Sequence, residues 1–110
     1  MAETLCVIRL TLTGWRILAR RLKAKAGTGL GEVDIVARHG NTLAFIEVKA
    51  RATFDAGLES VTPAQRARIA RSADVYLQRR PELGGCNIRF DVMVLRNGLI
   101  PRHIADAWRP

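Results

Sequence analysis

The chain has 110 residues, 48% of them hydrophobic, and no internal repeat, which predicts one compact domain over residues 1–110 and excludes a disordered chain. Eighteen Lys and Arg residues against ten Asp and Glu residues give a net charge of +8. Because fifteen of the eighteen are Arg, which pairs with phosphate through two parallel hydrogen bonds, the charge favours a nucleic-acid partner, although a GC-rich genome also enriches Arg.

A helix is predicted over residues 2–12, where Leu5, Ile8 and Leu12 recur at helical spacing. Glu3 would lie in its first turn, where a carboxylate suits the positive end of the helix dipole. The β-branched residues in this segment would also suit a strand, so that alternative stays open.

The opening apolar run, residues 5–10, is interrupted by Arg9 and is too short for a signal peptide or a membrane span. Cys6 and Cys86 lie far apart and form no CxxC motif, which is typical of reduced, buried thiols. We therefore expect a soluble, cytoplasmic protein.

A strand is predicted over residues 15–22. Its alternation places two sets of side chains on opposite faces: Trp15, Ile17 and Ala19, and Arg16, Leu18 and Arg20.

The connector over residues 23–31 is basic and rich in glycine. No Gly-Lys-Ser/Thr follows, and the next predicted element is a strand, so we interpret the segment as a loop and not as a phosphate cradle. Its lysines, Lys23 and Lys25, are nonetheless expected to contact a nucleic-acid backbone.

A β-hairpin is predicted over residues 31–49, because two apolar runs flank the turn dipeptide Gly40-Asn41. With a two-residue loop, paired positions sum to 81, which places Asp34 opposite Glu47. The apolar face then contains three pairs: Val33 with Val48, Ile35 with Ile46, and Ala37 with Ala44.

The opposite face of this hairpin gathers Glu32, Asp34, Glu47 and Lys49 at one end. Like charges directly opposite each other destabilise a sheet, and a divalent cation is the simplest compensation, since Mg²⁺ binds grouped carboxylates. Glu32 would pair with Lys49 and set its position. A slip of one residue in the loop would instead move Asp34 and Glu47 to opposite faces.

Residues 51–60 are interpreted as a surface loop, and a helix is predicted from Thr62 as N-cap and Pro63 as first residue to near Pro81. Its apolar stripe contains Ile69, Ala73, Tyr76 and Leu77, and a second set lies largely away from the stripe: Gln65, Arg68, Arg71 and Arg79. These arginines form either a solvated face or a second contact with a phosphate backbone. The nucleic-acid contacts that we expect are Lys23, Lys25, Arg51, Arg68 and Arg71.

A buried strand is predicted over residues 87–95, where Arg89 and Asp91 share one face as a structural ion pair. Residues 99–108 are expected to form a short strand and a final half-turn of helix. His103 has no second His or Cys at ligand spacing, so we interpret it as a packing or surface residue.

The resulting order is helix, three strands, helix, strand, which is an α/β fold with helices on the faces of a mixed sheet. Asp34, followed thirteen residues later by Glu47-Val48-Lys49, resembles the PD-(D/E)xK nuclease superfamily. More narrowly, the chain resembles the YraN family of uncharacterised bacterial proteins. The motifs that carry this resemblance are Ala2-Glu3, Gly14-Trp15-Arg16-Ile17-Leu18-Ala19-Arg20, Gly31-Glu32-Val33-Asp34, Phe45-Ile46-Glu47-Val48-Lys49, Val61-Thr62-Pro63, Arg89-Phe90-Asp91-Val92 and His103-Ile104.

This resemblance implies a restriction-endonuclease-like αβββαβ core related to archaeal Holliday junction resolvases. It further implies that Asp34 and Glu47 hold Mg²⁺, with Mn²⁺ as a substitute, that Lys49 is the catalytic lysine, and that Glu3 supplies a further metal-binding carboxylate. Where the family commonly has Lys-Gln after the Thr-Pro pair, this chain has Gln65-Arg66, which leaves the role of Gln65 open.

The leading hypothesis is therefore a metal-dependent endonuclease acting on DNA, including branched DNA, as a homodimer, because a unit of this size reads one strand at a time. One alternative is a nucleic-acid-binding module that has the nuclease fold and no turnover. Another is that the hairpin carboxylates dock a basic protein, which the charge of +8 disfavours.

Overall fold

The computed structural model describes residues 1–23, 27–97 and 100–110. Its elements follow one another as α1 (Ala2–Leu12), β1 (Arg16–Leu22), β2 (Val33–His39), β3 (Thr42–Ala50), α2 (Phe54–Glu59), α3 (Pro63–Gln78), the 3₁₀ turn η1 (Pro81–Leu83), β4 (Asn87–Leu95) and β5 (Pro101–Trp108). The expected αβββαβ order is present and is followed by β5, where a short strand was expected; α2 is an addition to it.

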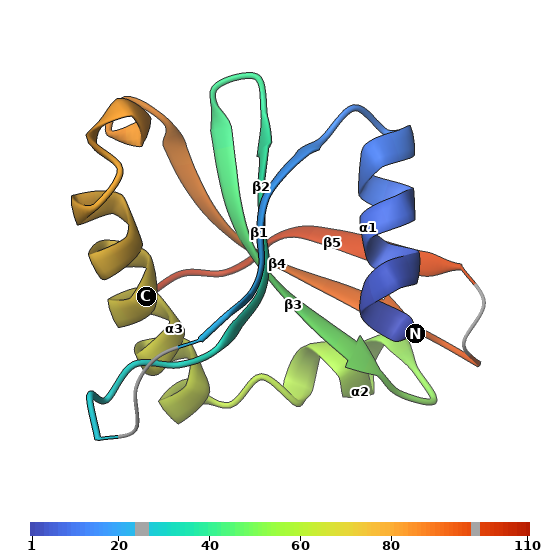
Figure 1. Cartoon of the computed structure of the whole chain (residues 1–110). Helices are drawn as coiled ribbons and strands as arrows, with labels where there is room; N and C mark the ends of the chain where they lie inside the picture. The colour runs from blue at the N-terminus through green and yellow to red at the C-terminus, as the bar shows by residue number, and fades with distance from the viewer. Residues whose placement is uncertain (24–26, 98–99) are drawn as a thin grey trace.

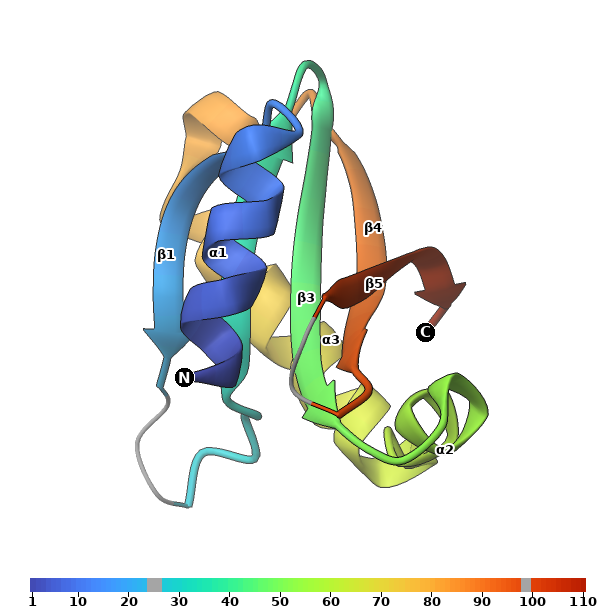
Figure 2. The same cartoon turned by 90° about the vertical axis from the view of Figure 1, so that its right-hand side faces the viewer.

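One five-stranded mixed sheet, ordered β1-β2-β3-β4-β5, forms the centre of the molecule. Only the β3–β4 pair is parallel; the other neighbours are antiparallel. Helix α1 covers one face of the sheet, and α3 covers the other (Figures 1 and 2). The α/β fold class predicted from the sequence is therefore confirmed.

Two hydrophobic cores fill the space between the sheet and the helices. The α1-side core contains Cys6, Leu10, Ile35, Ala37, Ala44, Ile46, Met93 and Leu95. The α3-side core contains Val33, Val36, Leu43, Phe45, Val61, Ile69, Ala73, Tyr76, Leu83, Phe90, Val92, Val94 and Trp108. Because both faces are covered, β3 and β4 are buried along most of their length, as central strands of a two-sided sheet should be.

The hairpin register is confirmed, since Ile35 pairs with Ile46 and His39 with Thr42 across the turn. Gly40, in this turn, has a φ of +57°, which glycine adopts without steric cost. The expected grouping of Val33 with Val48 is wrong: Val33 packs in the α3-side core and Val48 against the α1-side core. The ladder between β2 and β3 ends at Ile35 and Ile46, so strict alternation is lost before that point.

Strand β1 also departs from strict alternation. The prediction placed Ile17 and Ala19 on one face, but Ile17 packs against the α1-side core and Ala19 against the α3-side core. An irregularity in the β1–β2 pairing between residues 17 and 19 inserts an extra residue and reverses the faces beyond it.

Helix α1 is confirmed, but the stripe predicted to face the core is wrong in part. Ile8 and Leu12 are 50% and 78% exposed, whereas Cys6 and Leu10 are fully buried against the sheet. Residues four apart share a helix face, and the small Cys6 lets the helix approach the sheet closely. Both cysteines are free thiols, and burial raises the pKa of Cys6 to about 12.

Residues 51–60 do not form a loop, because α2 occupies Phe54–Glu59 with Thr53 as its N-cap. Gly57 allows this helix to lie on β4: a Cβ there would come within 2.5 Å of Val94 Cγ2.

The predicted final half-turn of helix is also wrong, since β5 continues as a strand to Trp108. Burial of Trp108 under Arg66 and Phe90 holds that end of the chain in the sheet.

Helix α3 begins as predicted, with the Thr62 hydroxyl oxygen accepting a hydrogen bond from the Gln65 backbone N–H at 3.2 Å and Pro63 at the first helical position. It ends at Gln78, before the turn that starts with Pro81. No helix in the described part of the chain is long and apolar enough to cross a bilayer.

Candidate functional site

The candidate site lies where β2 and β3 separate, beyond their last pair. There the Asp34 carboxylate, and not a strand carbonyl, accepts the hydrogen bond of the Val48 backbone N–H, at 2.7 Å. Strand β3 continues along its other neighbour, β4, as far as Ala50. Asp34 is therefore fixed beside a strand that is itself held in the centre of the sheet.

Glu47 is only 4% exposed, although it is a charged residue type. It follows Phe45 by two residues on β3, so its side chain points toward α3. The Gln65 side-chain amide donates a hydrogen bond to Glu47 Oε2 at 3.1 Å. The other oxygen, Oε1, is buried and has no hydrogen-bond partner among the described residues.

Burial and the neighbouring charge of Asp34 raise the pKa of Glu47 from its ordinary value of 4.5 to about 8, and the Lys49 ammonium partly opposes this. Burial also raises the pKa of Asp34, against the lowering effects of the Val48 N–H and of Lys49. Two carboxyl groups that share a desolvated position resist double ionisation. A cation placed between them would remove that penalty.

Lys49 lies on the same face of β3 as Glu47, two residues further on, and is half-buried. In the described ranges its ammonium group makes no hydrogen bond and no ion pair, so it is available to a substrate. The expected pairing of Glu32 with Lys49 is not formed there: Glu32 is exposed and precedes β2. Glu32 acts through its charge, which raises the pKa of both Asp34 and Glu47.

Glu3, in the first turn of α1, is held by arginines of β1. Its Oε1 accepts a hydrogen bond from Arg20 Nε at 2.8 Å and its Oε2 one from Arg21 Nε at 2.9 Å. Although burial acts in the opposite direction, these contacts lower the pKa of Glu3. Glu3 is near enough to raise the pKa of Asp34, but its charge is already compensated.

The donor set fits a hard divalent cation in its chemistry: two carboxylates, one of which has a buried oxygen without a partner. Across residues 1–23, 27–97 and 100–110, no three His, Cys, Asp or Glu side chains form a ready metal-binding group. Asp34 and Glu47 would therefore hold the ion together with water or a substrate phosphate, as Mg²⁺ sites commonly do.

Gln65 is the residue whose role the sequence left open, and it was predicted to point largely away from the core. The Thr62 cap places it in the first turn of α3, and the packing of α3 on the sheet brings its amide to Glu47. The capping motif determines on which side of α3 Gln65 lies, but nothing in the sequence predicts that α3 packs over β3.

The basic residues expected to contact nucleic acid are only partly free. Arg71 donates two hydrogen bonds to the Gly29 carbonyl oxygen, at 3.0 and 2.8 Å, and so holds the connector on α3. Arg51 donates one to the carbonyl oxygen of Ala50 at 2.8 Å. Lys23 and Arg68 are exposed, and Lys25 lies outside the described residues.

A second buried carboxylate, Asp91, lies on the opposite face of the sheet among basic partners. The predicted ion pair with Arg89 is confirmed, at 2.7 Å, and His103 Nε2 lies 2.6 Å from the same carboxylate oxygen. The other oxygen accepts the Asp106 backbone N–H at 2.9 Å. His103 is thus a packing residue with a polar partner, and it also contacts the Trp15 ring.

Comparison with known proteins shows the family to which the sequence of this chain belongs. The model of the uncharacterised protein family UPF0102 matches residues 2–95. A UPF0102 protein of Paramagnetospirillum magneticum is 53% identical over 109 residues, covering 99% of this chain and 84% of the relative. One of Parvibaculum lavamentivorans is 48% identical over 109 residues, covering 99% and 79%.

Among solved structures, a Holliday junction resolvase of Archaeoglobus fulgidus, named Hjc, is similar in fold. It aligns over 94% of this chain and 72% of its own, with 18% sequence identity and a TM-score of 0.49. A likeness at this level is loose, so we base the function on the geometry of the site itself.

Proposed function

The chain belongs to the UPF0102 family, the YraN family that its motifs resembled, and we propose that it is a metal-dependent endonuclease that hydrolyses phosphodiester bonds in DNA. The observation that carries this proposal is Glu47: a carboxyl group buried beside Asp34, with one oxygen that has no hydrogen-bond partner among the described residues and a pKa raised to about 8. A buried carboxyl group that destabilises the fold, and whose burial is not offset by other groups of the chain, is typical of a functional position.

Asp34 and Glu47 would hold Mg²⁺ or Mn²⁺, which supplies a Lewis acid for the phosphate and lowers the pKa of a bound water. Within the chain, the Val48 N–H fixes the Asp34 carboxylate, and the Gln65 amide fixes one oxygen of Glu47. The remaining oxygen of Glu47 is buried and has no hydrogen-bond partner among the described residues, so it would be available to a cation.

Lys49 would place its ammonium group against the same phosphate, because it extends from β3 on the side of Glu47 and has no acidic partner among the described residues. Positive charge that is already in position stabilises the negative charge that builds on phosphate oxygens during hydrolysis. Lys49 also lowers the pKa of both carboxyl groups, which favours their ionised, metal-binding forms.

DNA is the substrate class favoured by the charge of +8 and by the exposed cations that flank the site, such as Lys23 and Arg68. Glu3 is held by two arginines, so we assign it to positioning α1 beside Asp34 and not to the first set of metal ligands. A homodimer would present two such sites to a branched substrate.

Cleavage of four-way, nicked and fully paired DNA in the presence of Mg²⁺ tests this proposal. Glu47→Gln and Lys49→Gln should each lower the rate about a hundredfold or more, while the chain stays folded. Asp55→Asn, which changes an exposed carboxylate on α2, is the matched control and should cleave like the wild type.

Cleavage by Glu47→Gln at the wild-type rate would overturn the assignment of the site. Binding of DNA that weakens with salt, ignores chelator and never leads to cleavage would instead identify a nucleic-acid-binding module without turnover.

A further inference from the structure

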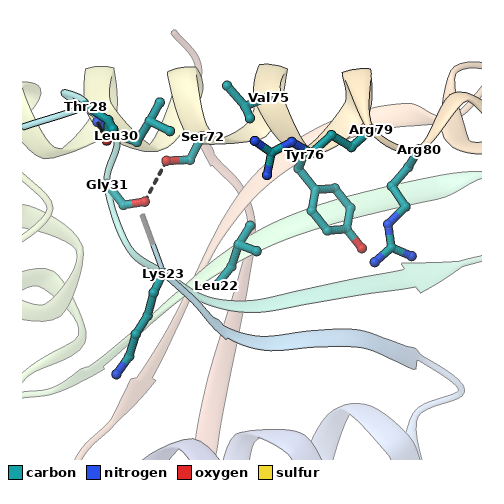
Figure 3. A pocket seen from close by; sticks show the side chains of 10 residues that line it. All are labelled: Leu22, Lys23, Thr28, Leu30, Gly31, Ser72, Val75, Tyr76, Arg79 and Arg80. Atoms are coloured by element: carbon teal, nitrogen blue, oxygen red, sulfur yellow. Dashed lines mark hydrogen bonds between the residues drawn. The ribbon is translucent and has the colours of Figure 1, made fainter. Parts of the chain in front are cut away.

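A pocket of about 440 Å³ lies between α3, the end of β1 and the connector that precedes β2 (Figure 3). Its volume falls within the range of small-molecule pockets, about 300–1,000 Å³. The residues that line it are Leu22, Lys23, Thr28, Leu30, Gly31, Ser72, Val75, Tyr76, Arg79 and Arg80. None of the residues assigned to the metal site is among them.

The lining combines an apolar wall with a cationic rim. Leu22, Leu30 and Val75 supply aliphatic surface, and Lys23, Arg79 and Arg80 supply three positive charges with no carboxylate among the lining residues. All three cations are exposed, and in the described ranges none of them forms an ion pair. A ligand suited to this lining has a flat or apolar body and at least one negative charge.

Tyr76 adds a polar group to the pocket, its phenolic hydroxyl. The residue is 6% exposed, and its hydroxyl is buried without a hydrogen bond among the described residues. The ring extends from α3 with its hydroxyl on the side of Arg80, and the Arg80 guanidinium lies 5.1 Å from the ring centroid (Figure 3). An unsatisfied buried hydroxyl is costly, and a ligand that reaches it as Arg80 moves would recover that cost.

The pocket adjoins the metal site along the chain. Gly31 lines the pocket, and Asp34 follows three residues later, so their Cα atoms are at most about 11 Å apart. Gly31 is held against α3, since its backbone N–H donates to the Arg68 carbonyl oxygen at 3.1 Å and a Cβ would come within 3.0 Å of Arg68. Along a DNA strand this distance corresponds to about three base pairs.

We propose that this pocket holds an unpaired nucleotide of the DNA strand that enters the metal site. The base would lie against the aliphatic wall with a polar edge on the Tyr76 hydroxyl, and the phosphate would lie among Lys23, Arg79 and Arg80. Proteins that select unpaired nucleotides combine these elements: a cationic path for the backbone and a pocket for the splayed base. The proposal deepens the proposed function, on which it rests, by naming distorted DNA as the substrate class.

The test measures binding and not cleavage. Two DNA duplexes of equal length, one fully paired and one with a single unpaired nucleotide at its centre, are titrated with the full chain in the presence of chelator. The wild type should bind the second duplex about tenfold more tightly. Arg80→Gln and Tyr76→Phe should each remove most of that ratio, while Arg9→Gln, on the far side of the sheet, should weaken both duplexes equally and keep the ratio.

Equal losses on both duplexes in Arg80→Gln and Tyr76→Phe would overturn the proposal, because they would show a non-selective phosphate contact. A second result would also overturn the proposal: the wild type binds free deoxythymidine monophosphate but shows no preference between the two duplexes. The pocket would then be a site for free nucleotides. Tyr76→Phe preserves the ring and Arg80 is exposed, so both variants should fold; thermal unfolding checks this. Since metal is absent, failure of the nuclease proposal alone would leave the ratio intact.

Discussion

Two buried carboxyl groups, Asp91 and Glu47, lie on neighbouring parallel strands and differ in their hydrogen-bond partners and in the direction of their pKa shifts. Asp91 on β4 is fully buried and accepts hydrogen bonds from Arg89 and the Asp106 N–H, with His103 beside it. Glu47 on β3 is 4% exposed, and among the described residues Gln65 is the one side chain that donates a hydrogen bond to it. Burial alone would raise both pKa values; the contacts reverse this for Asp91, whose pKa is lowered, and fail to do so for Glu47.

The difference separates a structural acid from a functional one. Asp91 is compensated by its own chain, so it joins β4 to β5 and to the Trp15 region as an ionised carboxylate. Glu47 lacks this compensation although it occupies an equally protected position. We propose that a bound cation would supply this compensation; burial alone does not distinguish the two roles.

The largest expected effect is at Asp91. Asp91→Asn leaves Arg89 and His103 without their anion and should lower the free energy of unfolding by about 3–5 kcal/mol, because removing one partner of a buried pair exposes the full desolvation cost of the rest. Urea denaturation at pH 7 measures it, with Asp74→Asn, an exposed acid on α3, as control. A loss below about 1 kcal/mol would show that Asp91 is not a structural acid and does not differ from Glu47 in this respect.

The second effect is the pH dependence that Glu47 imposes. Its folded-state pKa of about 8 exceeds the ordinary 4.5, so the folded chain binds more protons than the unfolded chain between these values. The free energy of unfolding should therefore fall as pH rises from 5 to 8, by about 3 kcal/mol relative to Glu47→Gln. Parallel curves for the two proteins in urea denaturation across this range would contradict the prediction.

Lys49→Gln tests how far the ammonium group of Lys49 offsets the raised pKa of Glu47. Lys49 lowers the pKa of Glu47, so its removal should move the upper end of the pH-dependent range above about 8. Titration of the Glu47 carboxyl carbon by NMR reports the shift directly. A pKa that stays the same or falls would show that the ammonium lies too far from the carboxylate to act on it.

The smallest effect is expected at the third acid, Glu3, which is held by two largely exposed arginines. Glu3→Gln should cost less than about 1 kcal/mol, because exposed ion pairs contribute little. A loss in thermal unfolding as large as that of Asp91→Asn would show that the ion pairs of Glu3 stabilise the fold as strongly as those of Asp91.

Much of the candidate site could be predicted from the sequence, because its determinants are local. The turn at Gly40 fixes the hairpin register as far as Ile35 and Ile46, and Asp34 and Glu47 each lie one residue beyond that last pair. Apolar periodicity and the Thr62 cap likewise locate the sheet strands and the start of α3.

The features that could not be predicted depend on tertiary packing. The hydrogen bond of Gln65 to Glu47 requires α3 to lie over β3, and the arginine partners of Glu3 require α1 to lie beside β1. Helix α2 is six residues long and contains Gly57, a poor helix former in isolation, yet only glycine fits against Val94. The irregularity in β1 likewise leaves no mark in the alternation of its residues.

Calorimetric titration of Mn²⁺ and Mg²⁺ tests whether a cation binds between Asp34 and Glu47, as we propose. The wild type should bind the metal near pH 7 with release of protons, because ionisation of Glu47 accompanies binding. The Asp34→Asn, Glu47→Gln double variant should not bind, whereas Asp55→Asn, Glu59→Gln, which alters two exposed acids of α2, should bind like the wild type. Unchanged binding by the first double variant, or no wild-type binding with or without DNA, would contradict the claim.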